Sequence, residues 1–75
     1  MLTKDQIKAG RALLRWSARE LAEKAGVRTE TILRLEGGSL DLDQSKFITV
    51  KNIRAALESG GVDLLEDGGV RLRQP

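Results

Sequence analysis

The chain contains neither cysteine nor histidine. Without cysteine it can form no disulfide and no thiolate metal site. Without histidine it lacks the usual zinc ligand and the commonest general base at neutral pH. The sequence also has no G-x-S-x-G, no phosphate-binding glycine loop and no zinc signature. Because no nucleophile–base pair is available, we expect no catalytic residue, no metal and no cofactor, and we predict that the chain is not an enzyme.

Aromatic residues are scarce, with one tryptophan, one phenylalanine and no tyrosine. Single-stranded nucleic acid is usually bound on aromatic side chains interleaved with cations, and this sequence offers no such platform. We therefore expect Trp16 to anchor the core beside Leu21. Long apolar runs are missing too, since none approaches membrane-spanning length and no signal-peptide segment follows Met1. These absences predict a cytoplasmic protein that does not engage a membrane.

The 75 residues suffice for one small domain. A domain of this size is marginally stable, so a homodimer that buries further apolar surface is expected. The net charge is +2, but residues 1–36 hold eight basic against five acidic residues, a balance of +3, and residues 37–75 hold five against six, a balance of −1. The basic half would help to bind phosphate, although an ordinary solvated surface explains the same charges.

Residues 17–36, SARELAEKAGVRTETILRLE, predict two short amphipathic helices joined by a tight turn. Ser17 and Glu20 have the S-x-x-E spacing of a capping box, in which each side chain satisfies a free amide at the helix start. Trp16 and Leu21 are placed for a hydrophobic staple across the same helix start. The first helix is therefore expected to begin at Ser17.

Gly26 stands where a helix C-terminus favours a left-handed residue. Val27 then fills the corner, and Ile32 and Leu35 form the inward stripe of the second helix. The outward positions of that helix are Arg28, Thr29, Glu30, Leu33 and Arg34. An exposed row of polar and cationic side chains on a helix held by a packed partner can enter a DNA major groove.

The pattern S-x-x-E-L-A-x-x-A-G-V-x-x-x-T-I-x-x-L-E-x-G in this segment resembles the Cro/repressor-type helix-turn-helix family, also called the XRE family. The likeness continues more loosely through ALLRW before the segment and IRAALESGGV after it. Two positions depart from the family. Ala18 stands where a glutamine usually contacts the DNA backbone, and Arg28 stands where a small capping residue is usual.

The resemblance implies a mainly α fold, a lambda-repressor-like bundle of four to five short helices, that binds double-stranded DNA as a homodimer. It also implies a sequence-specific transcriptional regulator acting as a repressor, with helix 28–36 in the major groove. Half-sites would lie roughly 34 Å apart, one helical turn. The candidates for base contact are Thr29, Glu30, Leu33 and Arg34, with Arg34 on guanine and Glu30 on cytosine. The other DNA-binding candidates, mostly at phosphates, are Ser17, Arg19, Lys24, Arg28, Ser45 and Lys46.

The N-terminal segment predicts a helix over residues 4–15, opened by a capping box of Thr3 and Gln6. Gly10 within it weakens the helix by about 1 kcal/mol, so we expect another helix to approach closely there. Glu36 is expected to be structural, bonding either backbone or an arginine of this helix, with Arg11 or Arg15 as its natural partner. The inner side should carry Ile7, Ala9, Leu13, Leu14 and the stem of Arg11, and a cationic ridge should carry Lys4, Lys8, Arg11 and Arg15.

Residues 39–48 are expected to form a loop with solvated aspartates between buried leucines, because Asp41 and Asp43 alone make a poor cation site. The β-branched run that follows places a helix boundary near Thr49, itself a good N-cap. A helix is then expected over residues 50–59, with Val50, Ile53 and Leu57 in the core.

Residues 62–73 predict a β-hairpin around a two-residue Asp67-Gly68 turn, in which both residues need positive φ. The expected division is a helix-turn-helix DNA-binding domain over 1–61 and a hairpin over 62–75 that is a candidate dimerisation element. A lone hairpin is marginal in water, so it must pack on the helices or pair with a second copy across a two-fold axis.

An alternative from a different class is a protein-interaction module that kept this fold without reading DNA. A related version is an antitoxin that binds a toxin partner and also represses its own promoter. Ala18, Glu30 and the near-neutral net charge favour this alternative slightly. Loss of DNA binding on Arg34→Ala would support DNA reading, and indifference to that change would support the interaction module.

Overall fold

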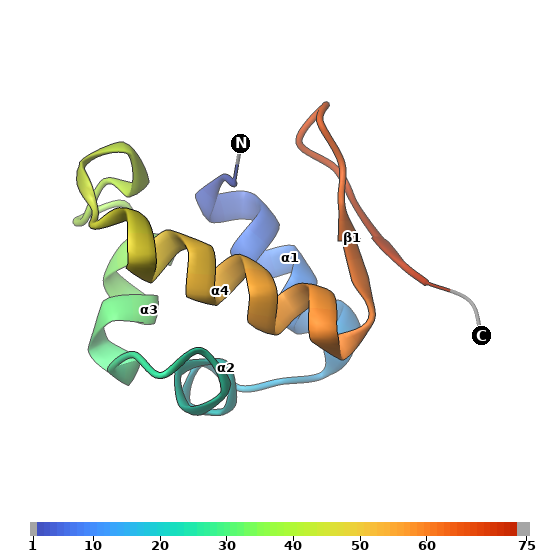
Figure 1. Cartoon of the computed structure of the whole chain (residues 1–75), viewed down its shortest axis with the longest axis horizontal. Coiled ribbons are helices and arrows are strands. Elements are labelled where there is room, and N and C mark those ends of the chain that lie inside the picture. The colour runs from blue at the N-terminus through green and yellow to red at the C-terminus, as the bar shows by residue number, and fades with distance from the viewer. Residues whose placement is uncertain (1, 74–75) are drawn as a thin grey trace.

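The computed structural model describes residues 2–73, which form four α-helices, one short 3-10 helix and a two-stranded antiparallel sheet (Figure 1). The elements in chain order are α1 (Lys4–Leu14), α2 (Ala18–Ala25), α3 (Thr29–Gly37), η1 (Leu42–Gln44), α4 (Phe47–Gly60), β1 (Val62–Leu64) and β2 (Val70–Leu72). The predicted mainly α fold with a C-terminal hairpin is confirmed. Met1 and residues 74–75, which the predicted domain division includes, lie outside the described residues.

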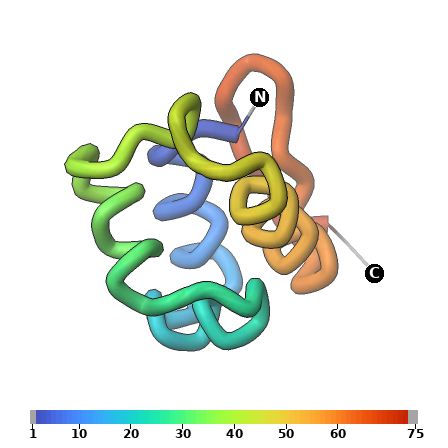
Figure 2. The backbone as a smooth tube through the Cα atoms, turned by 60° about the vertical axis from the view of Figure 1, so that its left-hand side comes forward, coloured from blue at the N-terminus to red at the C-terminus, as the bar shows by residue number. Residues whose placement is uncertain are grey.

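The helices enclose one core, with α2 packed on α3 and α4, and α1 packed on the same two helices (Figure 2). The hairpin lies against α1 and α4, at the end of the bundle opposite α3 (Figure 1). The largest fully buried side chains come from all four α-helices and from β1. They are Ile7, Leu21, Ile32, Leu35, Ile53, Leu57, Gln6 and Val62. The predicted inward stripe of α3 is therefore confirmed, as are the predicted core residues Ile53 and Leu57 of α4, and Val50 packs partly buried against the core. None of the helices in residues 2–73 combines the length and apolar character needed to cross a membrane.

Both predicted capping boxes are present. The Gln6 amide donates to the Thr3 hydroxyl at 3.1 Å, and the Thr3 amide donates to the Gln6 side chain at 3.0 Å. Ser17 and Glu20 exchange the equivalent pair at 3.0 and 2.9 Å. Gly26 takes the left-handed conformation with φ 70°, as expected for the turn before α3. These local signals fixed where α1 and α2 begin and where α2 ends.

The predicted start of the last helix was wrong. Helix α4 begins at Phe47, so the β-branched run from Ile48 to Val50 is helical and Thr49 is not its N-cap. Lys46 occupies the N-cap position without a side-chain hydrogen bond, and the amides of Thr49 and Val50 donate to its carbonyl. A β-branched residue costs a helix only about 0.5 kcal/mol relative to alanine, and the packing of α4 on the core outweighs that cost.

Two other expectations for the helical part have mixed outcomes. Gly10 does allow close approach, because a Cβ there would lie 3.1 Å from Cδ2 of the buried Leu57 in α4. Leu13, expected on the inner side of α1, is exposed instead. The helix presents only a narrow face to α3 and α4, and Leu14 on that side is packed against the core. The loop expected over residues 39–48 contains the single turn η1.

The hairpin has the predicted position but a different turn. Residues 65–69 connect the strands, the Gly68 amide donates to the Leu65 carbonyl at 3.1 Å, and the Leu65 amide donates to the Gly69 carbonyl at 2.9 Å. Within residues 65–69 only Gly68 has positive φ, at 92°. Because the Leu65 amide is bonded to Gly69, the loop itself is the three residues 66–68, which a left-handed glycine closes, and Asp67 need not be left-handed. Asp67 instead accepts from the Gly69 amide at 2.9 Å.

A buried glutamine attaches the hairpin to α1. The Gln6 side-chain amide donates to the carbonyls of Leu65 and Gly69, at 2.9 and 3.0 Å, at the base of the hairpin loop. Val62 in β1 is fully buried, and Leu64 packs against the core. The hairpin is thus held by one apolar contact surface and one polar clamp. In the sequence Gln6 is recognisable only as a cap, because no neighbouring residue indicates a hydrogen-bond partner about sixty positions away.

Candidate nucleic-acid interface

Helix α3 presents the predicted outward row to solvent. Its opposite side carries Ile32 and Leu35, which are fully buried against the core. Arg28, Glu30, Leu33 and Arg34 are exposed and Thr29 is half-buried. Val27 closes the corner before the helix and packs against the core, as expected. The row is therefore carried by a helix whose inner face is fixed, which is the arrangement that insertion into a groove requires.

The start of α3 has no side-chain cap. Arg28 occupies the N-cap position in an extended conformation and makes no capping hydrogen bond. Its carbonyl accepts from the amides of Thr31 and Ile32, so the helix forms normally after it. The first amides of the helix are left to water or to an anion. Where the resemblance leads us to expect a small capping hydroxyl, the helix thus begins with the exposed, positively charged side chain of Arg28.

Glu30 and Arg34 form an ion pair one turn apart on the exposed row. Nη1 of Arg34 lies 3.4 Å from Oε1 of Glu30, and both side chains are largely in water. Such an exposed pair is worth less than about 1 kcal/mol, so either partner can leave it for another contact. Their i, i+4 spacing on the helix brings the two side chains together, and Arg34 thereby neutralises the one acidic side chain of the row.

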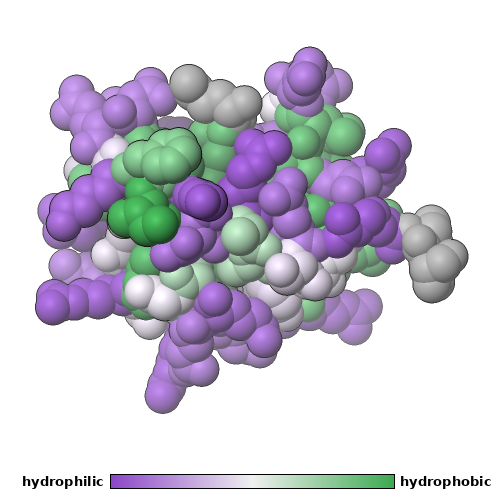
Figure 3. Space-filling view, in the orientation of Figure 1, coloured by the Kyte–Doolittle hydropathy of each residue, from purple (hydrophilic) through white to green (hydrophobic). Residues whose placement is uncertain are grey.

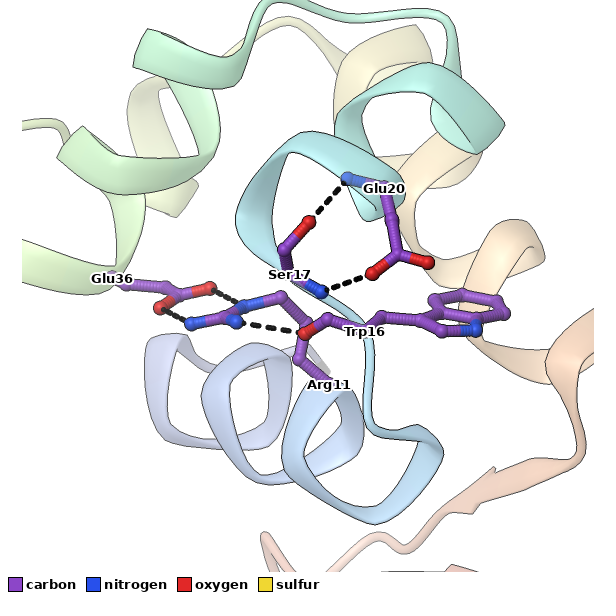
Figure 4. Close-up of polar contacts among 5 residues, drawn as sticks. All are labelled: Arg11, Trp16, Ser17, Glu20 and Glu36. Carbon is purple, nitrogen blue, oxygen red and sulfur yellow. Dashed lines mark hydrogen bonds and ion pairs between the residues drawn. The ribbon is translucent and has the colours of Figure 1, made fainter.

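A bidentate ion pair fixes the C-terminal end of α3 to α1 (Figure 4). Nε and Nη2 of Arg11 donate to Oε2 and Oε1 of Glu36, each at 2.7 Å, and Nη1 donates to the Trp16 carbonyl at 2.9 Å. The prediction that Glu36 is structural and pairs with Arg11 or Arg15 is confirmed for Arg11. These hydrogen bonds raise the pKa of Arg11, against the opposing effect of its partial burial. The guanidinium is therefore a permanent cation that joins α1, α3 and the link before α2.

The phosphate candidates on α2 lie in different surroundings. Ser17 is exposed at the start of the helix, where its hydroxyl caps the Glu20 amide. Arg19 is exposed and pairs loosely with Glu23 at 3.2 Å. Lys24 lies over the Trp16 ring, 5.0 Å from its centroid. Figure 4 shows that this indole points away from Glu36 at the C-terminal end of α3.

Ser45 and Lys46 lie between η1 and α4. The Ser45 hydroxyl donates to the Asp41 carbonyl at 2.9 Å, so it can offer a phosphate its proton only by breaking that bond. Lys46 is exposed at the start of α4. Asp41 accepts from the Asp43 amide at 3.0 Å and thereby caps η1. Within residues 2–73 no group of three or more potential ligands could hold a metal ion.

Two contacts around Trp16 were not foreseen. Its ring lies against the backbone of Gly60, where a Cβ would come within 2.5 Å of Cη2 and 2.7 Å of Cζ2. The ring also carries the Lys24 ammonium on its face. Trp16 does pack against the core, as predicted, but its partners come from the far end of α4. A glycine at position 60, just after the helix expected over residues 50–59, also suits a helix end, so the sequence does not by itself indicate the contact with Trp16.

No protein-family model and no curated protein sequence matches the chain.

Proposed function

We propose that the protein is a sequence-specific double-stranded DNA-binding regulator, acting as a transcriptional repressor and reading the major groove with helix 28–36. The observation that supports this proposal is the exposed row on α3. The buried Ile32 and Leu35 hold the opposite side of that helix, and the Arg11–Glu36 pair holds its C-terminal end. The proposal includes a cytoplasmic location and no enzymatic activity, metal or cofactor. Two subunits would be needed for a partly palindromic site.

Base reading would come from the middle of the row. Arg34 can leave its weak pair with Glu30 and fork onto O6 and N7 of guanine, which discriminates by about 1–3 kcal/mol against other bases. The released Glu30 carboxylate can accept from N4 of a cytosine. Leu33 is exposed and apolar, which suits a thymine methyl, and the Thr29 hydroxyl can donate, accept or meet a methyl.

Phosphate contact would come from the cations that flank the row. Arg19 and Arg28 are exposed, and Arg28 stands beside the uncapped start of α3. Lys46 is exposed at the start of α4. Such contacts set the protein on the duplex and make its affinity depend on salt, without adding sequence information.

The test is a salt titration of binding to duplex from the protein's own upstream region and to scrambled duplex. We expect a preference of about a thousandfold at physiological salt. Arg34→Ala should reduce that preference by about tenfold or more. Arg71→Ala is the matched control, because Arg71 is also an exposed arginine paired with a carboxylate but lies on the hairpin.

Equal, weak and steeply salt-dependent binding to both duplexes would overturn the proposal. The same holds if folded Arg34→Ala binds as well as the unchanged protein. Either result would favour the alternative function, in which the protein is an interaction module or antitoxin that binds a protein partner through this fold. The acidic Glu30 within the row is the observation that favours it.

A further inference from the structure

The N-terminal end of α4 carries the largest exposed apolar side chain of the described residues. Phe47 is 80% exposed and the adjacent Ile48 is 55% exposed. Figure 3 shows an apolar patch over this end of α4, surrounded by hydrophilic side chains. Neither residue packs against the core of its own subunit. A patch of this kind is a mark of a protein–protein contact.

Beside Phe47 lies a groove of about 470 Å³. It is lined mainly by the apolar Leu2 and Leu42 and by a stripe along α4 made of Phe47, Val50, Lys51 and Arg54. These four positions have i, i+3, i+4, i+7 spacing, so they form one face of the helix. A cavity of about 150 Å³ is already enough for benzene, so a phenyl ring fits this groove. The molecule therefore carries both a protruding ring and a groove that can receive one.

That combination suits a second copy of the same chain. A two-fold contact uses the same surface on both subunits. If residue i of one subunit contacts residue j of its partner, residue j of the first therefore contacts residue i of the second. If two α4 helices pack antiparallel about an axis between positions 50 and 51, Phe47 faces Arg54 of the partner subunit and Val50 faces Lys51 of the partner subunit. The first pair is a cation on an aromatic face, and the second is an apolar side chain on an aliphatic stem. Neither pair joins two like charges. The two Lys51 side chains do approach each other at the axis, but each can extend its ammonium group into water, and the groove lining also carries the carboxylate of Asp43.

The hairpin edge is less suited to the same role. If β2 paired with its own copy across a two-fold axis centred on Arg71 or on Leu72, Arg71 would stand opposite Arg71 or Arg73 of the partner subunit. Directly opposed like charges destabilise a strand pair. In addition, Asp63 on the neighbouring strand already holds both arginines, at 3.3 and 3.5 Å.

We propose that the α4 stripe, Phe47, Val50, Lys51 and Arg54, is the homodimer contact of this protein. The Phe47 ring of each subunit fills the groove of the other beside Arg54. None of these four residues belongs to the candidate DNA surface, and the groove beside them shares only Ser45 with it. The contact does not depend on DNA binding, and its test contains no DNA.

The test is sedimentation equilibrium of the full chain across a wide concentration range. We expect a reversible monomer–dimer equilibrium that Phe47→Asp weakens by about tenfold or more. Leu72→Asp is the matched control, because Leu72 is an exposed leucine on the hairpin, and it should leave the equilibrium unchanged. Circular dichroism and Trp16 fluorescence should be measured on both variants to check that they remain folded.

A second readout uses the absence of cysteine from the sequence. Lys51→Cys places a single thiol near the proposed axis, and a short bis-maleimide should join two subunits there. The control Arg71→Cys should give no cross-linked dimer. A protein that stays monomeric at all concentrations overturns the proposal, and so does a dimer lost with Leu72→Asp but kept with Phe47→Asp. The first result would leave the α4 patch to a different protein partner, and the second would assign the dimer to the hairpin.

Discussion

Arg11 in α1 and Glu36 in α3 are joined by two hydrogen bonds of 2.7 Å each, and the same guanidinium also holds the Trp16 carbonyl. The two side chains are only 20% and 9% exposed. This contact ties the candidate recognition helix to the first helix and to the segment that leads into α2. The orientation of the exposed row on α3 thus depends on Arg11, which is not itself one of the candidate DNA contacts.

Arg11→Ala should lower the free energy of unfolding by about 2–3 kcal/mol, because it leaves the nearly buried Glu36 carboxylate unpaired. Urea unfolding followed by Trp16 fluorescence measures the change. Arg19→Ala is the control, since its pair with Glu23 is exposed and should be worth less than about 1 kcal/mol. Equal losses for the two variants would contradict a special role for the Arg11 pair.

The Arg11–Glu36 contribution should also persist at alkaline pH. The hydrogen bonds to Glu36 raise the pKa of Arg11 in the folded state. A raised pKa means that the stabilisation is complete below the unfolded-state pKa and is lost only as pH rises through the folded one. Because arginine titrates above about pH 12, the stability difference between the unchanged protein and Arg11→Ala should be the same at about pH 7 and about pH 10. A loss of that difference at the higher pH would contradict this assignment.

Gln6→Ala should loosen the hairpin more than the helices. It removes both donors to the carbonyls of Leu65 and Gly69 and half of the Thr3 capping box, for a cost of about 2–3 kcal/mol. Hydrogen exchange should show lost protection at amides within residues 62–72, beyond the global change. Thr3→Ala, which removes the cap but keeps both donors, should leave the relative protection of the hairpin unaltered.

Gly60→Ala should destabilise the protein by about 1–3 kcal/mol, because its Cβ would overlap the Trp16 ring and Leu14. The displaced indole should shift the Trp16 fluorescence maximum. Gly37→Ala is the control, since a Cβ there meets nothing within 4 Å, and it should leave stability unchanged or increase it by up to about 1 kcal/mol. A neutral Gly60→Ala would mean that the ring can move away at no cost.

Arg15→Gly should raise stability by up to about 1 kcal/mol. Arg15 ends α1 in the left-handed conformation with φ 58°, the only residue other than glycine with positive φ among residues 2–73. Glycine takes that conformation without the Cβ strain, whereas Arg15→Ala removes the same charge and keeps the strain. The two variants compared by urea unfolding isolate the backbone effect, and an alanine variant as stable as the glycine variant would refute it.

Local chemistry in the sequence was enough to locate α1, α2 and α3. Capping boxes at Thr3 and Ser17 and the glycine at position 26 act within four residues, so their outcome barely depends on the rest of the chain. The inward stripe and outward row of α3 follow from the helical period, which also holds locally. Even the Arg11–Glu36 pair could be anticipated, because Glu36 is the acidic residue of α3 that does not belong to the outward row.

Long-range packing decided the rest. Helix α4 begins at Phe47 through a β-branched run that local propensity disfavours, because burying Ile53 and Leu57 against the other helices stabilises it more. Gln6 meets the hairpin loop and Trp16 meets Gly60 only once the chain has folded back on itself, across separations at which no periodicity operates. The exposed apolar start of α4, Phe47 and Ile48, is likewise a property of the assembled bundle. The helical spacing of α4 can be read from the sequence, but which side of the helix faces the core is decided by the packing of all four helices.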